Sequence, residues 1–382
     1  MNMHTDPQKI LEAERKDTYV PLSRPLSKEE REAFAAELDA LRRTMMAQTG
    51  EREASYIRRV RAMVRKSELA GRVLLMAGIL PPAWLAGTTL LAFSKIVDNM
   101  ELGHNVMHGQ YDFMNDPEYQ GSRFEWNNAC DGDEWRHSHN YMHHTFTNIQ
   151  NVDRDLGYGV LRLSEHEEWR PGHLIQPLYA LMLAVFFQYG VALHDLELDR
   201  VARGDRPLSE LKDKLPKVMR KLIRVSARDY LIFPALAGPF FMPVLLGNLS
   251  ANLIRNLWAF AIIFCGHFTE ESETYPESSK DSIDRGDWYL RQIRGSSNLE
   301  GGLWFHFMTG NLSHQIEHHL FPEIPAILYR DMAPKVREIC ARYGQSYNTG
   351  PFSRQFKTVV QRIFRFSLPF PVTSAARSSS LA

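Results

Sequence analysis

Long segments without charged residues alternate with strongly charged segments along this chain. The uncharged runs cover residues 73–94, 173–194 and 230–269, and the last contains one charge, Arg255. One helical crossing of a bilayer needs about 20 apolar residues, so the pattern predicts helices embedded in a membrane. The mean hydropathy of −0.33, which is typical of a soluble protein, hides this segregation.

The first and third runs are predicted to form helical hairpins. Residues 73–94 suffice either for one crossing or for a hairpin that turns at Pro81 and Pro82. Basic residues cluster within residues 58–72 and 200–228, whereas the expected hairpin tips near Pro81 and Asn248 carry none. Because Lys and Arg favour the cytoplasmic side, this distribution predicts two hairpins, the second turning near residues 247–250.

The second run, residues 173–194, is predicted not to cross. A full crossing would either place the C-terminal histidine cluster described below on the opposite side from the others, or expose the basic segment 200–228 outside the cell. We expect this run to lie in the membrane interface or to pack beneath the domain outside the membrane that carries the histidine clusters.

The other segments have patterns of soluble helices. Ser27 and Glu30 have the spacing of a capping box, so a helix is expected from there to about Gln48. Helices are also predicted near residues 302–318 and 330–344, while residues 1–26 and the serines at 378–380 are expected to be loose.

The predicted fold class is therefore all-α and integral to a membrane. Two transmembrane hairpins, with four short spans, are expected beneath a helical cytoplasmic catalytic domain. The predicted regions are a cytoplasmic segment with amphipathic helices (1–70), the membrane domain (71–345) and a partly disordered tail (346–382).

Composition excludes several other classes of protein. The 45 basic and 45 acidic side chains give no net charge, so no nucleic-acid partner is indicated. The three cysteines, Cys130, Cys265 and Cys340, are isolated, which excludes a disulfide framework and a cysteine-type zinc site. The polar N-terminus lacks the apolar core of a secretory signal, and none is expected.

Histidine provides the candidate chemistry. Three clusters each contain two histidines four residues apart: His104/His108, His139/His143 with His144 next to the pair, and His314/His318 with His319. Residues with this spacing share one face of a helix, and neutral imidazole is the commonest metal ligand among side chains. Eight or more imidazoles can hold two first-row transition ions, although the ligand type does not select the metal. We predict that the clusters converge on one metal centre.

The three motifs together resemble the histidine boxes of the membrane fatty acid desaturase superfamily, and most closely its bacterial acyl-CoA branch. They are Gly-His-Asn-Val-Met-His-Gly (103–109), Trp-Arg-His-Ser-His-Asn-Tyr-Met-His-His-Thr-Phe-Thr-Asn (135–148) and Gly-Asn-Leu-Ser-His-Gln-Ile-Glu-His-His-Leu-Phe-Pro (310–322). The resemblance covers residues 70–345. It implies a non-haem centre of two iron ions, O₂ as oxidant, and a further histidine ligand after the fourth crossing, a position filled by His267.

The resemblance also implies a set of metal ligands. The set is His104, His108, His139, His143, His144, His267, His318 and His319, together with His314 or Gln315. Many family members have a ligand three residues before the paired histidines, where this chain has Asn140 and Gln315. We keep His139 as a ligand and leave the choice between His314 and Gln315 open.

Other polar residues receive lesser roles. His137 and His306 are expected to support the ligands, His194 is expected to be structural, and His4, His166 and His173 are given no role. Asp153 and Asp155 are expected either to orient ligand imidazoles or to serve as ordinary helix caps.

The implied activity is O₂-dependent introduction of a cis double bond into a long-chain acyl group carried by CoA, acyl carrier protein or lipid. The chain lacks the Gly-x-Gly-x-x-Gly nucleotide motif, Cys-x-x-Cys clusters and the His-Pro-Gly-Gly motif of a fused cytochrome. Electrons are therefore expected from a separate ferredoxin, cytochrome b5-like protein or flavin reductase. The expected location is the bacterial inner membrane, with the active site facing the cytoplasm.

Basic side chains such as Arg58, Arg59 and those in residues 200–228 would hold the phosphates of a CoA or protein carrier, or else contact lipid headgroups. Two rival functions are a hydroxylase on the same scaffold and, in a different class, a membrane protein that binds or transports metal.

Overall fold

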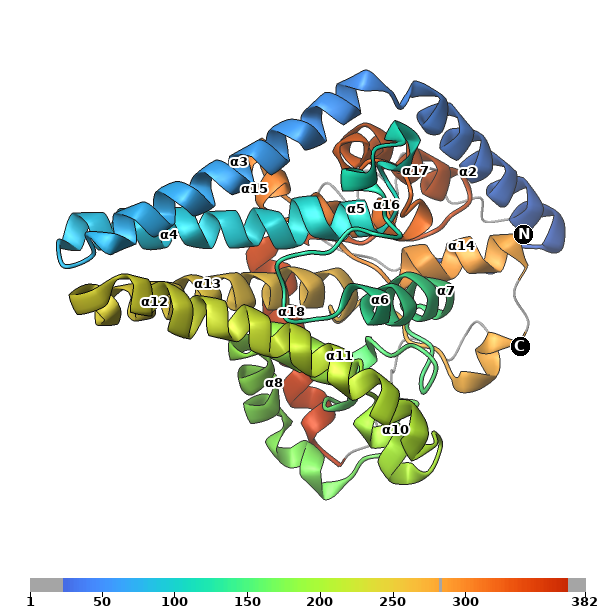
Figure 1. Ribbon diagram of the computed structural model, residues 1–382. Helices are drawn as coiled ribbons and strands as arrows, with labels where there is room; N and C mark the ends of the chain where they lie inside the picture. Colours follow the sequence, from blue (N-terminus) through green and yellow to red (C-terminus); the bar gives the residue numbers. More distant parts are fainter. Residues whose placement is uncertain (1–22, 282–283, 370–382) are drawn as a thin grey trace.

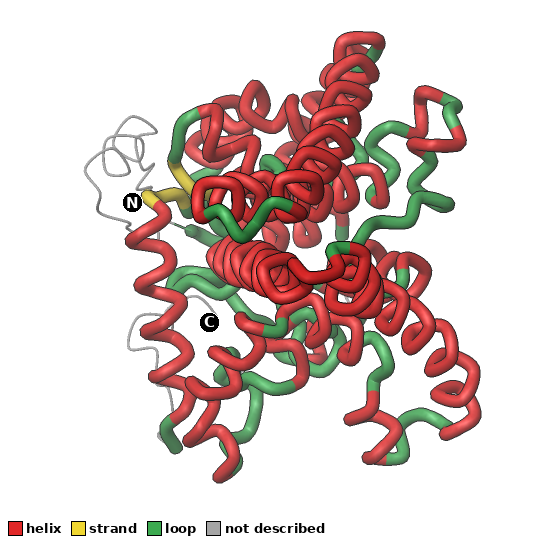
Figure 2. The backbone as a smooth tube through the Cα atoms, turned by 60° about the vertical axis from the view of Figure 1, so that its left-hand side comes forward, coloured by secondary structure: helices red, strands yellow, loops and turns green. Residues whose placement is uncertain are grey.

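The computed structural model describes residues 23–281 and 284–369, and it is mainly helical (Figures 1 and 2). Of the segment predicted to be loose, residues 1–26, residues 1–22 lie outside the described residues, as do His4 and the serine-rich end. The prediction is wrong for residues 23–26, because Leu26 is buried in the core. Two pairs of long helices extend together to one side in Figure 1, while α2, α14, α16 and α17 gather at the other.

The N-terminal helix α2 (Lys28–Gln48) confirms the predicted bounds and capping box. The Ser27 side chain accepts a hydrogen bond from the Glu30 backbone N–H, and the Glu30 side chain accepts one from the Ser27 N–H. This arrangement pairs two of the N–H groups that a helix start leaves free. One face of α2 buries Phe34 and Leu38 in a core shared with α14 (Arg285–Arg294) and α17 (Tyr329–Arg342).

The first hairpin consists of α3 (Glu51–Met76) and α4 (Pro81–Val97), as the two prolines predicted. Pro81 and Pro82 occupy the first turn of α4, where a missing N–H costs nothing. The two helices cross closely at Gly71 and Gly87. A Cβ atom on Gly71 would lie 2.9 Å from the Gly87 carbonyl oxygen.

The second hairpin turns earlier than predicted. Its first arm, which leads to the tip, comprises α11 (Leu208–Ala227), the π-helical η7 (Arg228–Ile232) and α12 (Phe233–Leu236). Its second arm, which leads back from the tip, is one unbroken helix, α13 (Phe241–His267). The predicted turn at 247–250 is therefore wrong. The chain turns at η8 (Gly238–Phe240), where Gly238 has a φ of +56°.

Gly247 and Asn248 stay helical for a packing reason. A Cβ atom on Gly247 would lie 2.5 Å from a methyl group of Leu75, so the glycine allows α13 to approach α3. The Asn248 amide donates to the carbonyl oxygen of Val244, one turn earlier.

The second uncharged run forms η6 (Pro171–Ile175), α8 (Gln176–Val185) and α9 (Phe187–His194), with a bend of 102° between α8 and α9. Among the described residues, one helical segment, Gly238–His267, is long and apolar enough to cross a membrane, and the bent pair adds a second if it is one span.

The C-terminal part corrects one predicted helix and confirms another. The segment expected at 302–318 is divided into α15 (Leu303–Met308), η10 (Leu312–His314) and α16 (Gln315–Leu320). Gly310 and Asn311 break it with φ values of +68° and +56°. At Gly310 the backbone approaches Met100 so closely that a Cβ atom would lie 2.4 Å from its carbonyl oxygen. The helix expected at 330–344 is α17.

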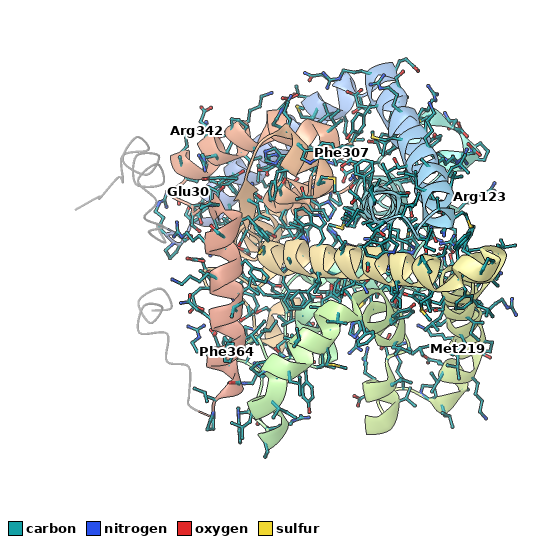
Figure 3. The ribbon with its side chains drawn as sticks, turned by 90° about the vertical axis from the view of Figure 1, so that its left-hand side faces the viewer. Glu30, Arg123, Met219, Phe307, Arg342 and Phe364 are labelled. Atoms are coloured by element: carbon teal, nitrogen blue, oxygen red, sulfur yellow. The ribbon has the colours of Figure 1, made fainter. Side chains whose placement is uncertain are left out.

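Two further elements close the fold. Strand β1 (Asn298–Glu300) pairs in parallel with β2 (Thr349–Pro351), and α18 (Phe352–Ser367) follows and runs across α13 (Figure 3). The remaining short helices lie mostly around the histidine motifs: η1 (Asp98–His104), α5 (Asn105–Met107), η2 (Asp112–Met114), η3 (Pro117–Tyr119), α6 (Gly132–Trp135), η4 (Arg136–His143), α7 (His144–Phe146), η5 (Leu156–Gly159), α10 (Leu198–Arg203), η9 (Glu277–Lys280) and η11 (Ala326–Leu328).

The close crossing of α3 and α4 gives a test of the fold. We expect Gly71→Ala to lower stability by about 1–3 kcal/mol, because the added methyl group forces the two backbones apart. Gly172→Ala is the matched control, since a Cβ atom there meets nothing within 4 Å. Thermal denaturation of the detergent-solubilised protein measures both changes, and equal melting temperatures would contradict the crossing.

Candidate metal centre

Eight of the predicted histidine ligands meet at one place inside the protein. They come from four segments: His104 ends η1 and His108 follows α5, His139, His143 and His144 lie in η4 and α7, His267 ends α13, and His318 and His319 lie in α16. Long-range folding therefore joins three motifs that are up to about two hundred residues apart in the chain.

Two of these segments are π-helical, η1 and η4. A π-helix bonds residue i to residue i+5, so each turn holds more residues than an α-helical turn, and such turns occur often at functional sites. In η4 the rings of His139 and His143 stack with centroids 5.0 Å apart. The four-residue spacing that departs from the family motif thus leaves both rings on one side of the helix.

The imidazole nitrogens gather into neighbouring groups. Within the first group, His104, His108, His139 and His318 each offer a nitrogen, and these atoms lie within 4.8 Å of one another. The second group contains His143, His267 and His319. His144 groups with His318 and His319 and so connects the two.

Several of these nitrogens are buried without a hydrogen-bond partner in the described part of the chain. They are the Nε2 atoms of His108, His139, His144 and His318. In the second group, the Nε2 atom of His267 lies 3.3 Å from that of His143 and 3.2 Å from that of His319. Buried polar atoms without partners are rare and costly, so converging lone pairs of this kind fit bound metal ions.

The opposite nitrogens of several rings are held by other side chains. The Nδ1 atom of His143 lies 2.9 Å from Asp153 Oδ2, and that of His139 lies 2.8 Å from Asp155 Oδ2. These contacts confirm that both aspartates can accept ring N–H bonds, while Asp153 also accepts the Asn148 N–H. Partners of this kind fix the ring orientation of a metal ligand.

Gln292 is a site residue that the sequence did not indicate. Its Oε1 atom lies 2.9 Å from Nδ1 of His319, and its amide donates to the carbonyl oxygen of His144. Gln292 belongs to α14 and to no recognisable motif, so only the folded chain reveals the contact.

The structure separates His314 from Gln315. The His314 ring stacks on His306 at 4.6 Å and is absent from the histidine groups, whereas the Gln315 amide nitrogen lies 2.9 Å from Nε2 of His267. Gln315 therefore lies beside the histidine groups with its Oε1 atom buried and without a partner among the described residues, and His314 lies apart from them. The break at Gly310 and Asn311 starts α16 at Gln315 and gives the two side chains different directions.

The remaining predicted histidines lie outside the cluster. His137 is exposed and stacks on Tyr141 at 6.0 Å. His306 lies 2.7 Å from the Ser313 hydroxyl, and His194 packs near Tyr158.

Burial keeps most of the cluster neutral. It lowers the pKa of His104 to about 4 and lowers the pKa values of His108, His139, His144, His318 and His319 well below the ordinary value. His143 is different, because the Asp153 carboxylate raises its pKa against the effect of burial. Neutral imidazole is the metal-binding form, so the site is prepared for metal at neutral pH.

A narrow inner cavity opens next to the first histidine group. His104, His139 and Gln315 line one end, and the cavity continues along α13 past Ile263 and Ala259. Trp135 stacks on His139 with ring centroids 4.5 Å apart. The cavity has a volume of about 50 Å³ and lies directly beside the histidine rings.

Comparison with known proteins agrees with this geometry. The fatty acid desaturase family profile matches residues 80–351. The chain belongs to the fatty acid desaturase family. This assignment confirms the resemblance drawn from the three histidine motifs and makes the protein an oxidoreductase of the desaturase type.

Individual relatives of this desaturase are also known. It is 41% identical over 342 residues to an NADPH-dependent stearoyl-CoA 9-desaturase of Mycobacterium tuberculosis, with 88% of this chain and 80% of the relative covered. It is 26% identical to an sn-1 linoleoyl-lipid 6-desaturase of Synechocystis, over 76% of this chain and 82% of the relative. No solved structure matches the chain.

The ring–carboxylate contacts predict the effect of one substitution on this desaturase. Asp153→Asn should weaken metal retention about 10–100-fold, because the His143 ring loses a charged acceptor. The chelator concentration that removes half of the bound metal measures the change. Asp331→Asn, at a half-exposed aspartate of α17, is the control, and equal retention in all three proteins would refute a role for Asp153.

Proposed function

We propose that this protein is a membrane-bound acyl-CoA desaturase that forms a cis double bond at a non-haem di-iron centre. The observation that carries the proposal is the meeting of two groups of buried imidazoles, several of whose Nε2 atoms have no hydrogen-bond partner among the described residues, beside an inner cavity. In the balanced reaction, O₂, two electrons and two protons remove two hydrogens from neighbouring methylenes and yield two waters.

The grouping of the nitrogen atoms supports one division of the ligands. One iron would be held by His104, His108, His139 and His318, and the other by His143, His267 and His319, with His144 and Gln315 completing the shells. Iron supplies the O₂ chemistry, because no amino-acid side chain abstracts hydrogen from an unactivated methylene. The protein's own residues orient the rings, hold the acyl chain and exclude water.

Exposed apolar side chains support a membrane arrangement of the hairpins. Leu85 on α4, Leu236 on α12 and Leu246 on α13 are 60%, 70% and 48% exposed, which suits contact with lipid tails. We propose four short spans, formed by α3, α4, the α11–α12 arm and α13. The bend between α8 and α9 supports placing this pair beside the membrane without a crossing.

The cluster lies at one end of these spans. His104 follows α4 and His267 ends α13, so both helices deliver their ligands on the side away from the hairpin tips. Basic residues gather on this same side and favour the cytoplasm. We place the site at the cytoplasmic face of a bacterial inner membrane.

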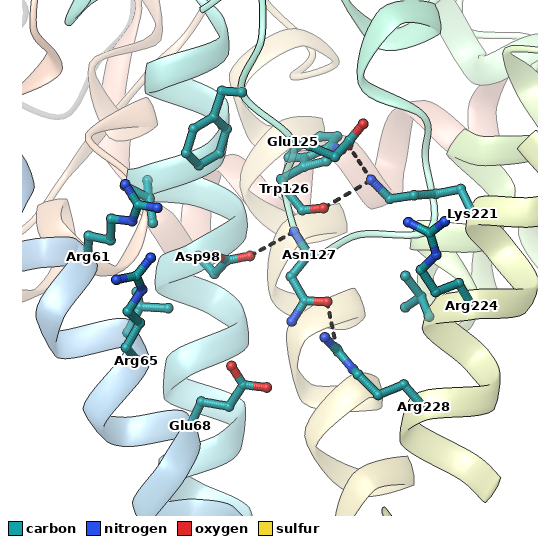
Figure 4. Close-up of a pocket in the computed structure, with 14 residues that line it drawn as sticks. Arg61, Arg65, Glu68, Asp98, Glu125, Trp126, Asn127, Lys221, Arg224 and Arg228 are labelled. Carbon is teal, nitrogen blue, oxygen red and sulfur yellow. Dashed lines mark hydrogen bonds and ion pairs between the residues drawn. The ribbon is translucent and has the colours of Figure 1, made fainter. Parts of the chain in front are cut away.

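A basic outer cleft of about 390 Å³ lies between α3 and α11 (Figure 4). Arg61 and Arg65 line the cleft from α3, and Lys221 and Arg224 line it from α11, with Arg228 at the start of η7. Arg65 and Arg224 have no carboxylate partner within the described residues, unlike Lys221, which pairs with Glu125. Guanidinium groups of this kind bind phosphate well.

The outer cleft and the inner cavity share Trp126. We propose that the CoA phosphates rest in the cleft while the acyl chain passes Trp126 towards the histidines. The name of the mycobacterial relative, a stearoyl-CoA desaturase, supports CoA over a lipid carrier.

Electrons come from a separate donor in this proposal. A ferredoxin, a cytochrome b5-like protein or a flavin reductase would serve, and the relative's NADPH dependence favours a reductase that oxidises NADPH.

The function is tested with purified protein, acyl-CoA and a reducing system. We expect about two irons per chain, O₂ uptake that depends on acyl-CoA, and a double bond detected by mass spectrometry. His318→Ala should lose iron and activity, whereas His137→Ala, an exposed histidine of the same motif, should keep both. A hydroxylated product would support the rival hydroxylase, and a protein purified without iron would refute the di-iron proposal.

The outer cleft is tested separately. Arg65→Glu should raise KM for acyl-CoA about 10–100-fold with little change in kcat, because a charged hydrogen bond to phosphate is lost. Arg59→Glu makes the same charge change on α3 outside the cleft lining and is the control. An equal effect of both variants would indicate general attraction to an anionic surface.

A further inference from the structure

One stripe of side chains on α13 connects the metal cluster to a polar site deeper in the helices. Arg255, Ala259, Ile263 and His267 are spaced four residues apart, so successive members are neighbours and the four form a stripe that winds gradually around the helix. The stripe is about 18 Å long, because an α-helix rises 1.5 Å per residue. Its first three members line the inner cavity that begins at His104 and His139.

The middle of this cavity is apolar. Met100 from η1, Phe187 and Val191 from α9, and Ala259 and Ile263 from α13 line it. These walls suit a hydrocarbon chain, since each methylene buried against them improves binding about fourfold. Ala259 is the smallest side chain among these five.

The far end of the cavity is polar and firmly held. Arg255 is 2% exposed; its Nε donates to Asn256 Oδ1 at 2.9 Å, and its Nη2 donates to Asn252 Oδ1 at 3.1 Å. Asn256 in turn donates to the Val185 carbonyl oxygen. We call Arg255, Asn256 and Gln188 the polar floor.

A network of charged residues holds the polar floor in place through Asn252, which accepts a hydrogen bond from Arg255. The Asn252 amide donates to Asp229 Oδ2 at 3.1 Å, and Asp229 also pairs with Lys95 and Arg72. This network joins α3, α4, η7 and α13. The guanidinium of Arg255 therefore cannot withdraw to make room for a longer chain.

Gln188 is the member of the polar floor whose side chain makes no hydrogen bond to other described residues. It is 2% exposed, and neither its Oε1 nor its Nε2 atom has a partner among the described residues. A buried amide of this kind requires a polar neighbour such as water in the cavity. An apolar chain that reached the amide would displace that neighbour and leave it unpaired.

We propose that the polar floor sets how far an acyl chain extends beyond the metal centre, and so fixes the preferred chain length. The inference rests on the proposed desaturase function. Methylenes are favoured along the apolar walls, and the methyl end stops where the next methylene would meet Gln188 and Arg255. The carrier and thioester at the other end do not contact the floor.

Two substitutions test the floor in opposite directions. Gln188→Leu removes the unpaired amide without breaking a hydrogen bond of the described structure, so folding should be preserved. It should shift affinity towards longer acyl-CoA, by about fourfold or more for each added methylene. Ala259→Leu narrows the cavity and should shift affinity towards shorter chains. Leu257→Ala, on the exposed face of α13, is the control.

The measurement is the Kd of the metal-loaded protein for a series of saturated acyl-CoA molecules of increasing length, with turnover followed by mass spectrometry. Double-bond position counted from the thioester should stay constant, because the path from carrier to metal is unchanged. Thermal denaturation verifies folding, and Ala259→Val replaces Ala259→Leu if the larger side chain prevents it.

Opposite shifts in the two variants support the proposal, and unchanged length profiles overturn it. The proposal would also be overturned if Gln188→Leu raised the affinity for acyl chains with a terminal hydroxyl group but did not raise the affinity for longer unsubstituted chains. Failure of the proposed function is distinguishable, because wild-type protein would then bind acyl-CoA with a defined length profile but form no double bond.

Discussion

The structure depends on placing many imidazole lone pairs in one buried space. Each lone pair without a partner disfavours folding, so the cluster is stable only if cations satisfy it or if surrounding groups hold the rings rigidly. Asp153, Asp155 and Gln292 provide that rigidity from the opposite nitrogen of three rings. The same lone pairs that oppose folding in the absence of metal are the ones that would bind it in the proposed centre.

The helical hairpins bring histidines that are distant in the chain close together in space. In both, a helix returns from the tip and delivers histidine at its end, His104 after α4 and His267 at the end of α13. Buried ion pairs of Asp229 with Lys95 and Arg72 join the hairpins to each other. Such pairs add little net stability, but removing one partner leaves a buried charge, so they specify how the helices pack.

α13 connects the parts of the molecule that the proposed reaction needs. A winding stripe of its side chains carries His267 of the cluster, an apolar wall and the polar floor at regular four-residue intervals, while residues such as Leu253 and Leu257 are exposed. The proposed substrate path thus runs from the basic outer cleft, past Trp126 and the histidines, and along this helix. Its shape follows from helical periodicity and from the close packing that Gly247 permits.

The sequence alone determined the features that depend on local rules. The capping box at Ser27, the hairpin turn at Pro81 and the histidine pairs were readable because each acts within a few residues. The tertiary structure decided the rest. The break in the helical segment at Gly310 depends on the close approach of Met100. The continuation of helix α13 through Gly247 depends on its packing against Leu75. The choice of Gln315 over His314 beside His267 and the contact of Gln292 with His319 likewise join residues distant in the chain, which no local pattern encodes.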